Sequence, residues 1–152
     1  MAYPALEGRR ELLDALADAT DELGFALASL GAAYEQLDVE TADTLEQSLF
    51  GPTQRAYGRA KRTYTAFAQR AGVEPAGFEA QSAGLPSTGA HGFIDNAAGA
   101  ISATGGKLAT LQDSPVLLEV GDAELRKGLT ETRELIADLP RRARELTRRL
   151  GR

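Results

Sequence analysis

Apolar side chains recur every three or four residues through the first and last thirds of this chain. In the last third the apolar stripe comprises Leu118, Leu125, Leu129, Thr132, Ile136, Leu139, Ala143, Leu146 and Leu150. In the first third it comprises Leu6, Leu13, Leu16, Thr20, Leu23, Leu27, Leu30, Tyr34 and Leu37. Because 3.6 residues complete a helical turn, each stripe lies on one face of a helix that must pack against another element.

Four long helices account for most of the sequence. We expect them at about 4–37, 41–71, 90–112 and 115–150, with a long loop over 72–89. Thr41 and Ser114 are candidate N-caps, and Gly72 is a natural C-terminal stop for the second helix. Within the loop, Phe78 and Leu85 are expected to pack on the helices, and a short helical turn could form at 75–81.

Glycine and proline mark the places where these helices should deviate from straight rods. Gly51-Pro52 predicts a kink or a short break in the second helix, and Gly121 and Pro140 predict bends in the fourth. The third helix contains four glycines: Gly92, Gly99, Gly105 and Gly106. Each helical glycine costs about 0.5–1 kcal/mol relative to alanine. We expect close approach of a neighbouring helix to offset this cost; a groove lined by small residues is the alternative.

The length of 152 residues suits a single domain, spanning 1–152, with one continuous core. Four amphipathic helices and no strictly alternating segment predict an all-α fold, with an antiparallel four-helix bundle as the architecture. An interlocked dimer of helical hairpins would bury the same stripes and is the alternative. No apolar run is long enough to predict a transmembrane segment. We expect a cytoplasmic protein.

The residue types present exclude most enzymatic chemistry. The chain has no cysteine and a single histidine, His91, which excludes thiolate metal sites and the paired histidines of ferritin-like di-metal sites. The serines share one candidate imidazole base, and no nucleophile elbow occurs. We therefore expect a protein without a cofactor or resident metal ion, more consistent with binding than with catalysis.

Carboxylates provide the one enzymatic alternative. In the first helix they recur at helical intervals, at Glu11, Asp14, Asp18, Asp21 and Glu22. Two further pairs, Asp43 with Glu46 and Glu131 with Glu134, stand three residues apart and therefore share a helix face. A hard cation such as Mg²⁺ binds oxygen ligands of this kind, as in metal-dependent nucleotide or phosphoester hydrolases. A solvated acidic surface is the simpler interpretation of the same residues.

The charge is unevenly distributed along a chain whose net charge is −5. Residues 51–72 include basic residues and no acid, and residues 141–152 carry six arginines against Glu145 alone. In an up-down-up-down bundle both segments lie at one end, near the acids that begin the first helix, and most other acids gather at the opposite end. Favourable interaction with helix dipoles is the simpler explanation. The candidate partner-binding residues are Arg55, Arg59, Arg62, Arg141, Arg142, Arg144, Arg148 and Arg149.

These features favour a non-catalytic helical interaction or scaffold module. The expected partner is a protein or another anionic molecule, or a second copy of the chain. Anionic lipid and phosphate are further candidate ligands, and an amphipathic lipid- or granule-surface protein is a second alternative. Duplex nucleic acid is disfavoured because the chain is net negative and its basic tracts are short.

Overall fold

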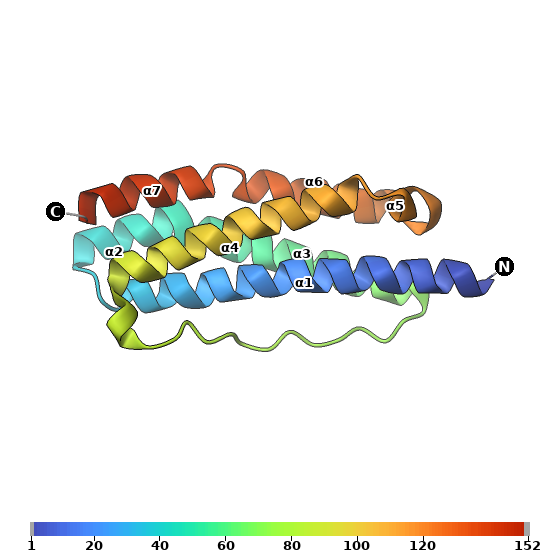
Figure 1. Cartoon of the computed structure of the whole chain (residues 1–152), viewed down its shortest axis with the longest axis horizontal. Helices are drawn as coiled ribbons and strands as arrows, with labels where there is room; N and C mark the ends of the chain where they lie inside the picture. Colours follow the sequence, from blue (N-terminus) through green and yellow to red (C-terminus); the bar gives the residue numbers. More distant parts are fainter. Residues whose placement is uncertain (1, 151–152) are drawn as a thin grey trace.

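The computed structural model describes residues 2–150, with side chains from residue 4 onward, and this part of the chain is a bundle of helices without a strand (Figure 1). The predicted all-α four-helix bundle is therefore confirmed. The helices are α1 (Ala2–Tyr34), α2 (Val39–Leu45), α3 (Gly51–Ala71), α4 (Gly89–Gln112), α5 (Pro115–Val120), α6 (Ala123–Ile136) and α7 (Leu139–Leu150). A π-helical segment, Glu46–Phe50, joins α2 to α3, and a 3₁₀ turn, Pro86–Thr88, precedes α4.

Four rods make up the bundle: the helices α1, α3 and α4, and the consecutive pair α6 and α7. The α1 helix packs against α3 and α4. On the other side of the bundle, α6 packs against both α3 and α4, and α7 packs against α4. Every neighbouring pair of long helices is antiparallel, whereas α3 and α4 run in the same direction (Figure 1). The order along the chain is thus up-down-down-up, and the up-down-up-down order expected from the sequence is wrong.

A long crossover segment, residues 72–85, makes this order possible. It runs along the outside of the bundle from the end of α3 back to the start of α4 (Figure 1). An extended chain reaches about 3.3 Å per residue, so this segment can exceed the roughly 36 Å length of α4. Gly72 begins it with a φ of 72°, the left-handed conformation expected of a helix-ending glycine.

Phe78 attaches the crossover to the bundle, as the sequence suggested. Its ring meets the ring of Tyr64 edge-on, with the centroids 5.1 Å apart, and the backbone N–H of Ala76 donates to the Tyr64 hydroxyl at 3.2 Å. Leu85, which was also expected to pack there, is 73% exposed. The helical turn considered for 75–81 does not form.

The second predicted helix changes from α to π geometry just before Gly51-Pro52, the point at which the sequence predicted a kink or a short break. The chain passes through the π-helical segment immediately before Gly51, and Pro52 occupies the first turn of α3, where a missing N–H costs little. The start of α2 differs from expectation because its N-cap is Asp38. The carboxylate of Asp38 accepts the Thr41 backbone N–H at 2.8 Å, and this hydrogen bond lowers the pKa of Asp38.

Residues 115–150 form three helices instead of one bent helix. Ser114 caps α5 by accepting the Val116 N–H at 3.2 Å, as predicted. The first break follows α5 at Gly121, and the second comes just before Pro140. Leu118 is 78% exposed, so this first residue of the predicted apolar stripe is not part of the core.

The core is otherwise built from the predicted apolar stripes. In the first helix these buried residues are Leu13, Leu16, Thr20, Leu23 and Leu30. In α6 and α7 they are Leu125, Leu129, Thr132, Ile136, Leu139, Ala143 and Leu146. Tyr34 departs from the pattern because it is 39% exposed at the end of α1. Helical periodicity thus identified the buried faces; apart from Leu27, which is only partly buried in the middle of α1, the errors fall near helix ends.

The glycines of α4 do not mark close helix contacts, so that expectation is wrong. A Cβ at Gly99, Gly105 or Gly106 would have no atom of a neighbouring element within 4 Å. The close approach occurs instead at Gly128 of α6, where a Cβ would lie only 2.5 Å from Cγ2 of Thr63 on α3. The alternative interpretation, a groove lined by small residues, agrees with a groove beside Gly106.

Candidate functional site

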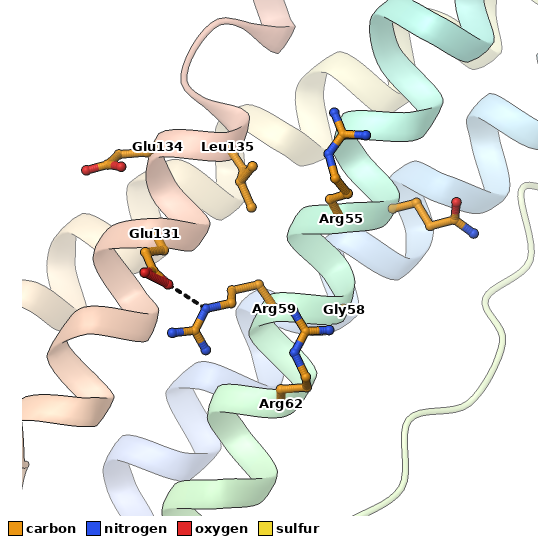
Figure 2. A pocket seen from close by; sticks show the side chains of 8 residues that line it. Arg55, Gly58, Arg59, Arg62, Glu131, Glu134 and Leu135 are labelled. Carbon is orange, nitrogen blue, oxygen red and sulfur yellow. Dashed lines mark hydrogen bonds and ion pairs between the residues drawn. The ribbon is translucent and has the colours of Figure 1, made fainter.

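Three of the predicted partner-binding arginines share one face of α3. Arg55, Arg59 and Arg62 occupy positions i, i+4 and i+7, which fall on one side of a helix. They line a groove of about 590 Å³ between α3 and α6 (Figure 2). The other lining residues are Gln54, Gly58, Glu131, Glu134 and Leu135. We call this the arginine groove.

The central arginine of this groove is fixed in place. Arg59 Nε lies 2.7 Å from a carboxylate oxygen of Glu131, and Arg59 Nη1 donates to the Thr63 hydroxyl at 3.0 Å. The hydrogen bond from Arg59 holds the pKa of the Glu131 carboxyl below its usual value. The pair forms because α3 and α6 approach closely at Thr63 and Gly128. Arg59 therefore has a defined orientation without a ligand.

The two flanking arginines are exposed. Within residues 2–150, neither Arg55 nor Arg62 takes part in an ion pair. The guanidinium of Arg62 lies beside Gly58, where a Cβ would be only 3.2 Å from Nη1 (Figure 2). The carboxylate of Glu134 points away from the arginines in the same view. The α3 side of the groove thus presents two uncommitted positive charges.

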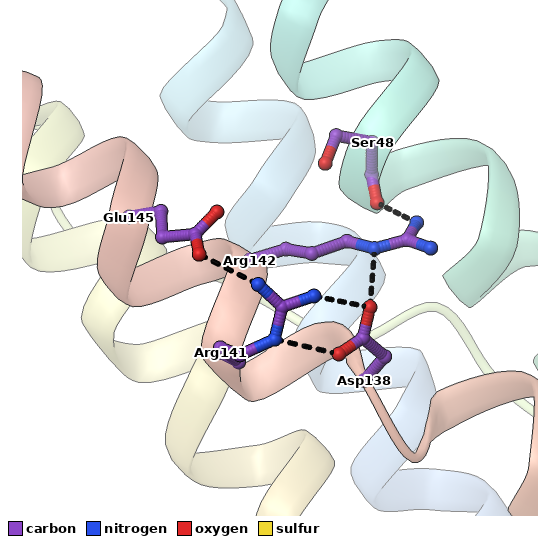
Figure 3. A network of polar contacts seen from close by, with 5 residues as sticks. All are labelled: Ser48, Asp138, Arg141, Arg142 and Glu145. Atoms are coloured by element: carbon purple, nitrogen blue, oxygen red, sulfur yellow. Dashed lines mark hydrogen bonds and ion pairs between the residues drawn. The ribbon is translucent and has the colours of Figure 1, made fainter.

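The arginines at the start of α7 belong to a separate network (Figure 3). Arg141 binds both oxygens of Asp138, each at 2.8 Å, and reaches Glu145 at 2.6 Å. Arg142 donates to Asp138 at 3.0 Å and to the backbone carbonyl of Ser48 at 3.0 Å. The hydrogen bond from Arg141, followed by that from Arg142, lowers the pKa of Asp138. Arg142 therefore ties α7 to the segment before α3, whereas the exposed Arg141 pairs with residues at the start of its own helix.

The remaining predicted arginines, Arg144, Arg148 and Arg149, lie exposed on α7. Arg149 lines a cleft of about 610 Å³ whose other side carries Asp38, Glu40 and Asp43 from the start of α2. Acidic residues thus face this end of α7. Because charges of both signs line this cleft, it should attract an anionic partner less strongly than the arginine groove does.

The expected basic pole does not form. The bond from Arg142 to Ser48 places the start of α7 beside the start of α3, and the two helices then run in opposite directions. Arg70, near the end of α3, pairs with Asp122 at 2.7 Å, at the far end of the bundle. The crossover causes this arrangement, because it reverses the direction of α4 and of everything after it. The predicted acidic pole is divided for the same reason, since Asp122 lies far from Asp38.

The carboxylates proposed for metal-dependent hydrolysis do not converge. Glu131 is engaged by Arg59, and Lys107 lies 2.8 Å from Asp18 and 3.3 Å from Glu22. His91 Nδ1 lies 3.1 Å from Asp95 on an exposed turn of α4. In the part of the chain that the structure covers, no three His, Asp or Glu residues are grouped to hold a metal ion.

Two further findings bear on function. The sequence matches no protein-family model, no curated protein and no solved structure. Among residues 2–150, no helix combines the length and the apolar character that crossing a membrane requires. Sequence reasoning missed the Arg59–Glu131 pair, since its members are 72 positions apart and no local pattern links them.

Proposed function

We propose that this chain is a non-catalytic helical binding module that holds an acidic segment of a protein partner in the arginine groove. The proposal rests on how the three arginines of this groove are held: one is fixed by an ion pair, and two are exposed without one. Arg59 is oriented by Glu131, and Arg55 and Arg62 on either side of it are exposed and have no ion pair within residues 2–150.

The spacing of the arginines favours an extended acidic segment. The seven-residue step from Arg55 to Arg62 corresponds to about 10 Å along the helix axis. Guanidinium groups bind carboxylates through paired, charge-assisted hydrogen bonds, and several carboxylates spread over this distance would use them together. A single phosphate would reach only part of the groove. Leu135 supplies an apolar contact on the α6 side.

The orientation of Arg59 also favours binding. An arginine that is already held by Glu131 and Thr63 loses little side-chain freedom when a partner arrives. Exposed Arg55 and Arg62 can then supply new charge-assisted hydrogen bonds without breaking internal ones. This combination supports recognition of a protein segment, and the net charge of −5 weighs against a polyanion as large as duplex nucleic acid.

The other functions considered from the sequence have less support. A lipid- or granule-surface role requires an apolar face, but the apolar stripes of α1, α3, α6 and α7 form one buried core. The hydrolase alternative requires convergent carboxylates, and those of Asp18, Glu22 and Glu131 lie against Lys107 or Arg59. Neither role is therefore proposed for this chain.

The proposal can be tested with a fluorescein-labelled synthetic peptide of alternating glutamate and alanine. Fluorescence anisotropy would compare wild-type protein with the double variant Arg55→Gln/Arg62→Gln. We expect the variant to bind about tenfold more weakly or worse, corresponding to about 1.4 kcal/mol or more of binding free energy. Added salt should weaken wild-type binding, because both flanking charges are exposed to solvent.

The matched control is Arg144→Gln/Arg148→Gln, which removes two exposed charges from α7 and leaves the arginine groove intact. This control should retain the wild-type affinity within about threefold. Equal losses in the two double variants would show a response to net charge alone and would contradict the proposal. Flotation with vesicles containing anionic lipid, in place of peptide binding, would favour the lipid alternative.

A further inference from the structure

A second groove lies between α1 and the C-terminal half of α4, and it differs in character from the arginine groove. Its volume is about 560 Å³. The floor is apolar: Leu12 is 2% exposed and Leu111 is 5% exposed, and both belong to the core. The walls carry small side chains, including Ala15 and Ala103, and Gly106 leaves the α4 side open.

The groove continues along the N-terminal part of α1 beside α5. A second cavity, of about 500 Å³, shares Glu11 and Val116 with the first. Here α5 is packed directly on α1, since a Cβ at Gly8 would lie 3.0 Å from Cγ2 of Val120. Val116 and Val120 extend the apolar surface along this part. The two cavities adjoin along α1 and form one channel open to solvent. The channel is mainly apolar between α1 and α4, and beside α5 it is also lined by charged side chains, Arg10 and Glu119 among them.

Acidic residues predominate on the α1 side of this channel, where Arg10 is the basic lining residue, and Lys107 lines the α4 side. Glu7, Glu11, Asp14 and Asp18 follow one another at steps of four, three and four residues, and all are exposed. This stripe extends over about 16 Å of the helix. Asp18 is paired with Lys107, whereas Glu7, Glu11 and Asp14 have no ion pair within the described chain. We call the channel and this stripe the acidic groove.

We propose that the acidic groove binds a cationic amphipathic helix of a partner protein. The apolar floor requires an apolar face of matching length, and an amphipathic helix provides one in the established helix-in-groove manner. The acids of α1, spaced four, three and four residues apart, require basic side chains with similar spacing along one flank of the partner helix. One occupant thereby satisfies both the apolar floor and the charged rim.

Other occupants satisfy only part of the site. A fatty acid or a nucleotide would place its own negative charge beside Glu11 and Asp14. A small neutral molecule would leave the acidic stripe without partners. A second copy of this chain would bring arginines on α3 or α7, but the apolar faces of those helices, including Phe67 and Leu146, are already buried. The amphipathic cationic helix is therefore the occupant that the geometry favours.

The test uses a synthetic peptide of about 18 residues, with leucines on one helical face and lysines at steps of four, three and four on its flank. A scrambled peptide of the same composition controls for charge alone. Isothermal titration calorimetry should show binding of the helical peptide to the wild-type chain and at least about tenfold weaker binding of the scrambled peptide. Equal binding of the two peptides would overturn the proposal.

Two variants locate the site. Glu11→Gln/Asp14→Asn removes two exposed charges from the rim, and Gly106→Leu fills the channel at a position where a Cβ meets no atom within 4 Å. Each should weaken binding about tenfold. The matched controls are Glu35→Gln/Glu40→Gln, which removes two acids elsewhere, and Gly99→Leu, which adds the same side chain outside the groove. Both controls should bind like the wild type.

Thermal unfolding would confirm that each variant is folded before it is scored. Unchanged peptide affinity in both groove variants would refute the acidic groove as the site. Sedimentation analysis adds one more outcome: a wild-type oligomer that dissociates in Glu11→Gln/Asp14→Asn would identify a second copy as the occupant and would overturn the partner-helix proposal. The variants of the acidic groove change residues other than Arg55 and Arg62, so either of the two binding proposals can fail without the other.

Discussion

Arg70 and Asp122 form a bidentate ion pair that joins the end of α3 to the start of α6. The guanidinium donates to the two carboxylate oxygens of Asp122 at 2.7 and 2.9 Å. One of these oxygens also accepts the Leu125 backbone N–H at 2.8 Å, so Asp122 is the N-cap of α6. A single carboxylate therefore starts a helix and fixes which helix ends meet.

Replacement of this carboxylate should destabilise the bundle. For Asp122→Ala we expect a loss of about 1–2 kcal/mol in the free energy of unfolding, because the cap contributes about 1 kcal/mol and a half-exposed ion pair adds a few tenths. Arg70→Ala keeps the cap and should cost less than about 1 kcal/mol. Urea denaturation followed by circular dichroism measures both changes. A larger loss in Arg70→Ala than in Asp122→Ala would contradict this account.

The stability of the fold should fall in acid. The hydrogen bond from Arg70 lowers the pKa of Asp122, and bonds from Arg59 and Arg141 lower the pKa of Glu131 and Asp138 respectively. A carboxyl with a depressed folded-state pKa binds its proton more readily when unfolded, so its contribution is present above about pH 4 and is lost as the pH falls toward the folded-state pKa.

Urea midpoints measured at pH 7, 5 and 3 would check this pH dependence. The midpoint should change little between pH 7 and 5 and should fall at pH 3. In Asp122→Asn the fall should be smaller, because one of the responsible carboxyls is absent. A midpoint that rises on acidification would show that the depressed pKa values do not control stability.

The contact between Gly128 and Thr63 predicts an unusual response to alanine. Gly128→Ala would place a Cβ 2.9 Å from Cβ of Thr63 and closer still to other Thr63 atoms, so the overlap should cost about 1–3 kcal/mol despite the better helix propensity of alanine. Gly99→Ala is the matched control, since its Cβ meets no atom within 4 Å, and should stabilise by about 0.5–1 kcal/mol.

The overlap can be relieved by a second change. Thr63→Ala removes the hydroxyl and methyl groups that the new Cβ would meet, so the double variant with Gly128→Ala should lose less stability than the two single losses added together. Chemical denaturation of the four proteins provides this cycle. Strict additivity would indicate that the two helices do not touch at this point.

The crossover should depend on Phe78 for its attachment. Phe78→Ala removes the edge-on contact with Tyr64, worth about 0.5–1.5 kcal/mol beyond the buried area. Limited proteolysis should then cut within 72–85 several-fold faster, while the circular dichroism of the helices stays unchanged. Leu85→Ala serves as the control, because Leu85 is 73% exposed and should not alter the cleavage rate.

Much of the local structure was predictable because it depends on neighbouring residues. The apolar periodicity located the long helices, Ser114 and Gly72 acted as cap and stop, and Gly51-Pro52 marked the interruption before α3. Thr41 was the wrong cap because Asp38, three residues earlier, supplies a charged acceptor. The single helix over 115–150 was wrong because its breaks near Gly121 and Pro140 are complete.

The candidate site was predictable only in part. The arginine stripe on α3 follows from the spacing of Arg55, Arg59 and Arg62, and the structure places these side chains in one groove. Their separation from the arginines of α7 could not be read from the spacing. The length of the 72–89 loop was the available signal, because a connection long enough to cross the bundle permits consecutive helices to run in the same direction.

Local sequence patterns were enough to predict the all-α fold, most of the buried faces and the presence of two arginine-rich segments. These properties arise from hydrogen bonds and side-chain contacts within a few turns of one helix. Which helix ends meet, and therefore which charges are neutralised, depends on tertiary contacts. Arg70 pairs with Asp122, 52 positions away, and Arg142 donates a hydrogen bond to Ser48, 94 positions away. Both contacts form because the crossover sets the direction of α4 and of the helices that follow it. Such long-range pairs depend on the path of the whole chain, and the periodicity of a single helix does not predict that path.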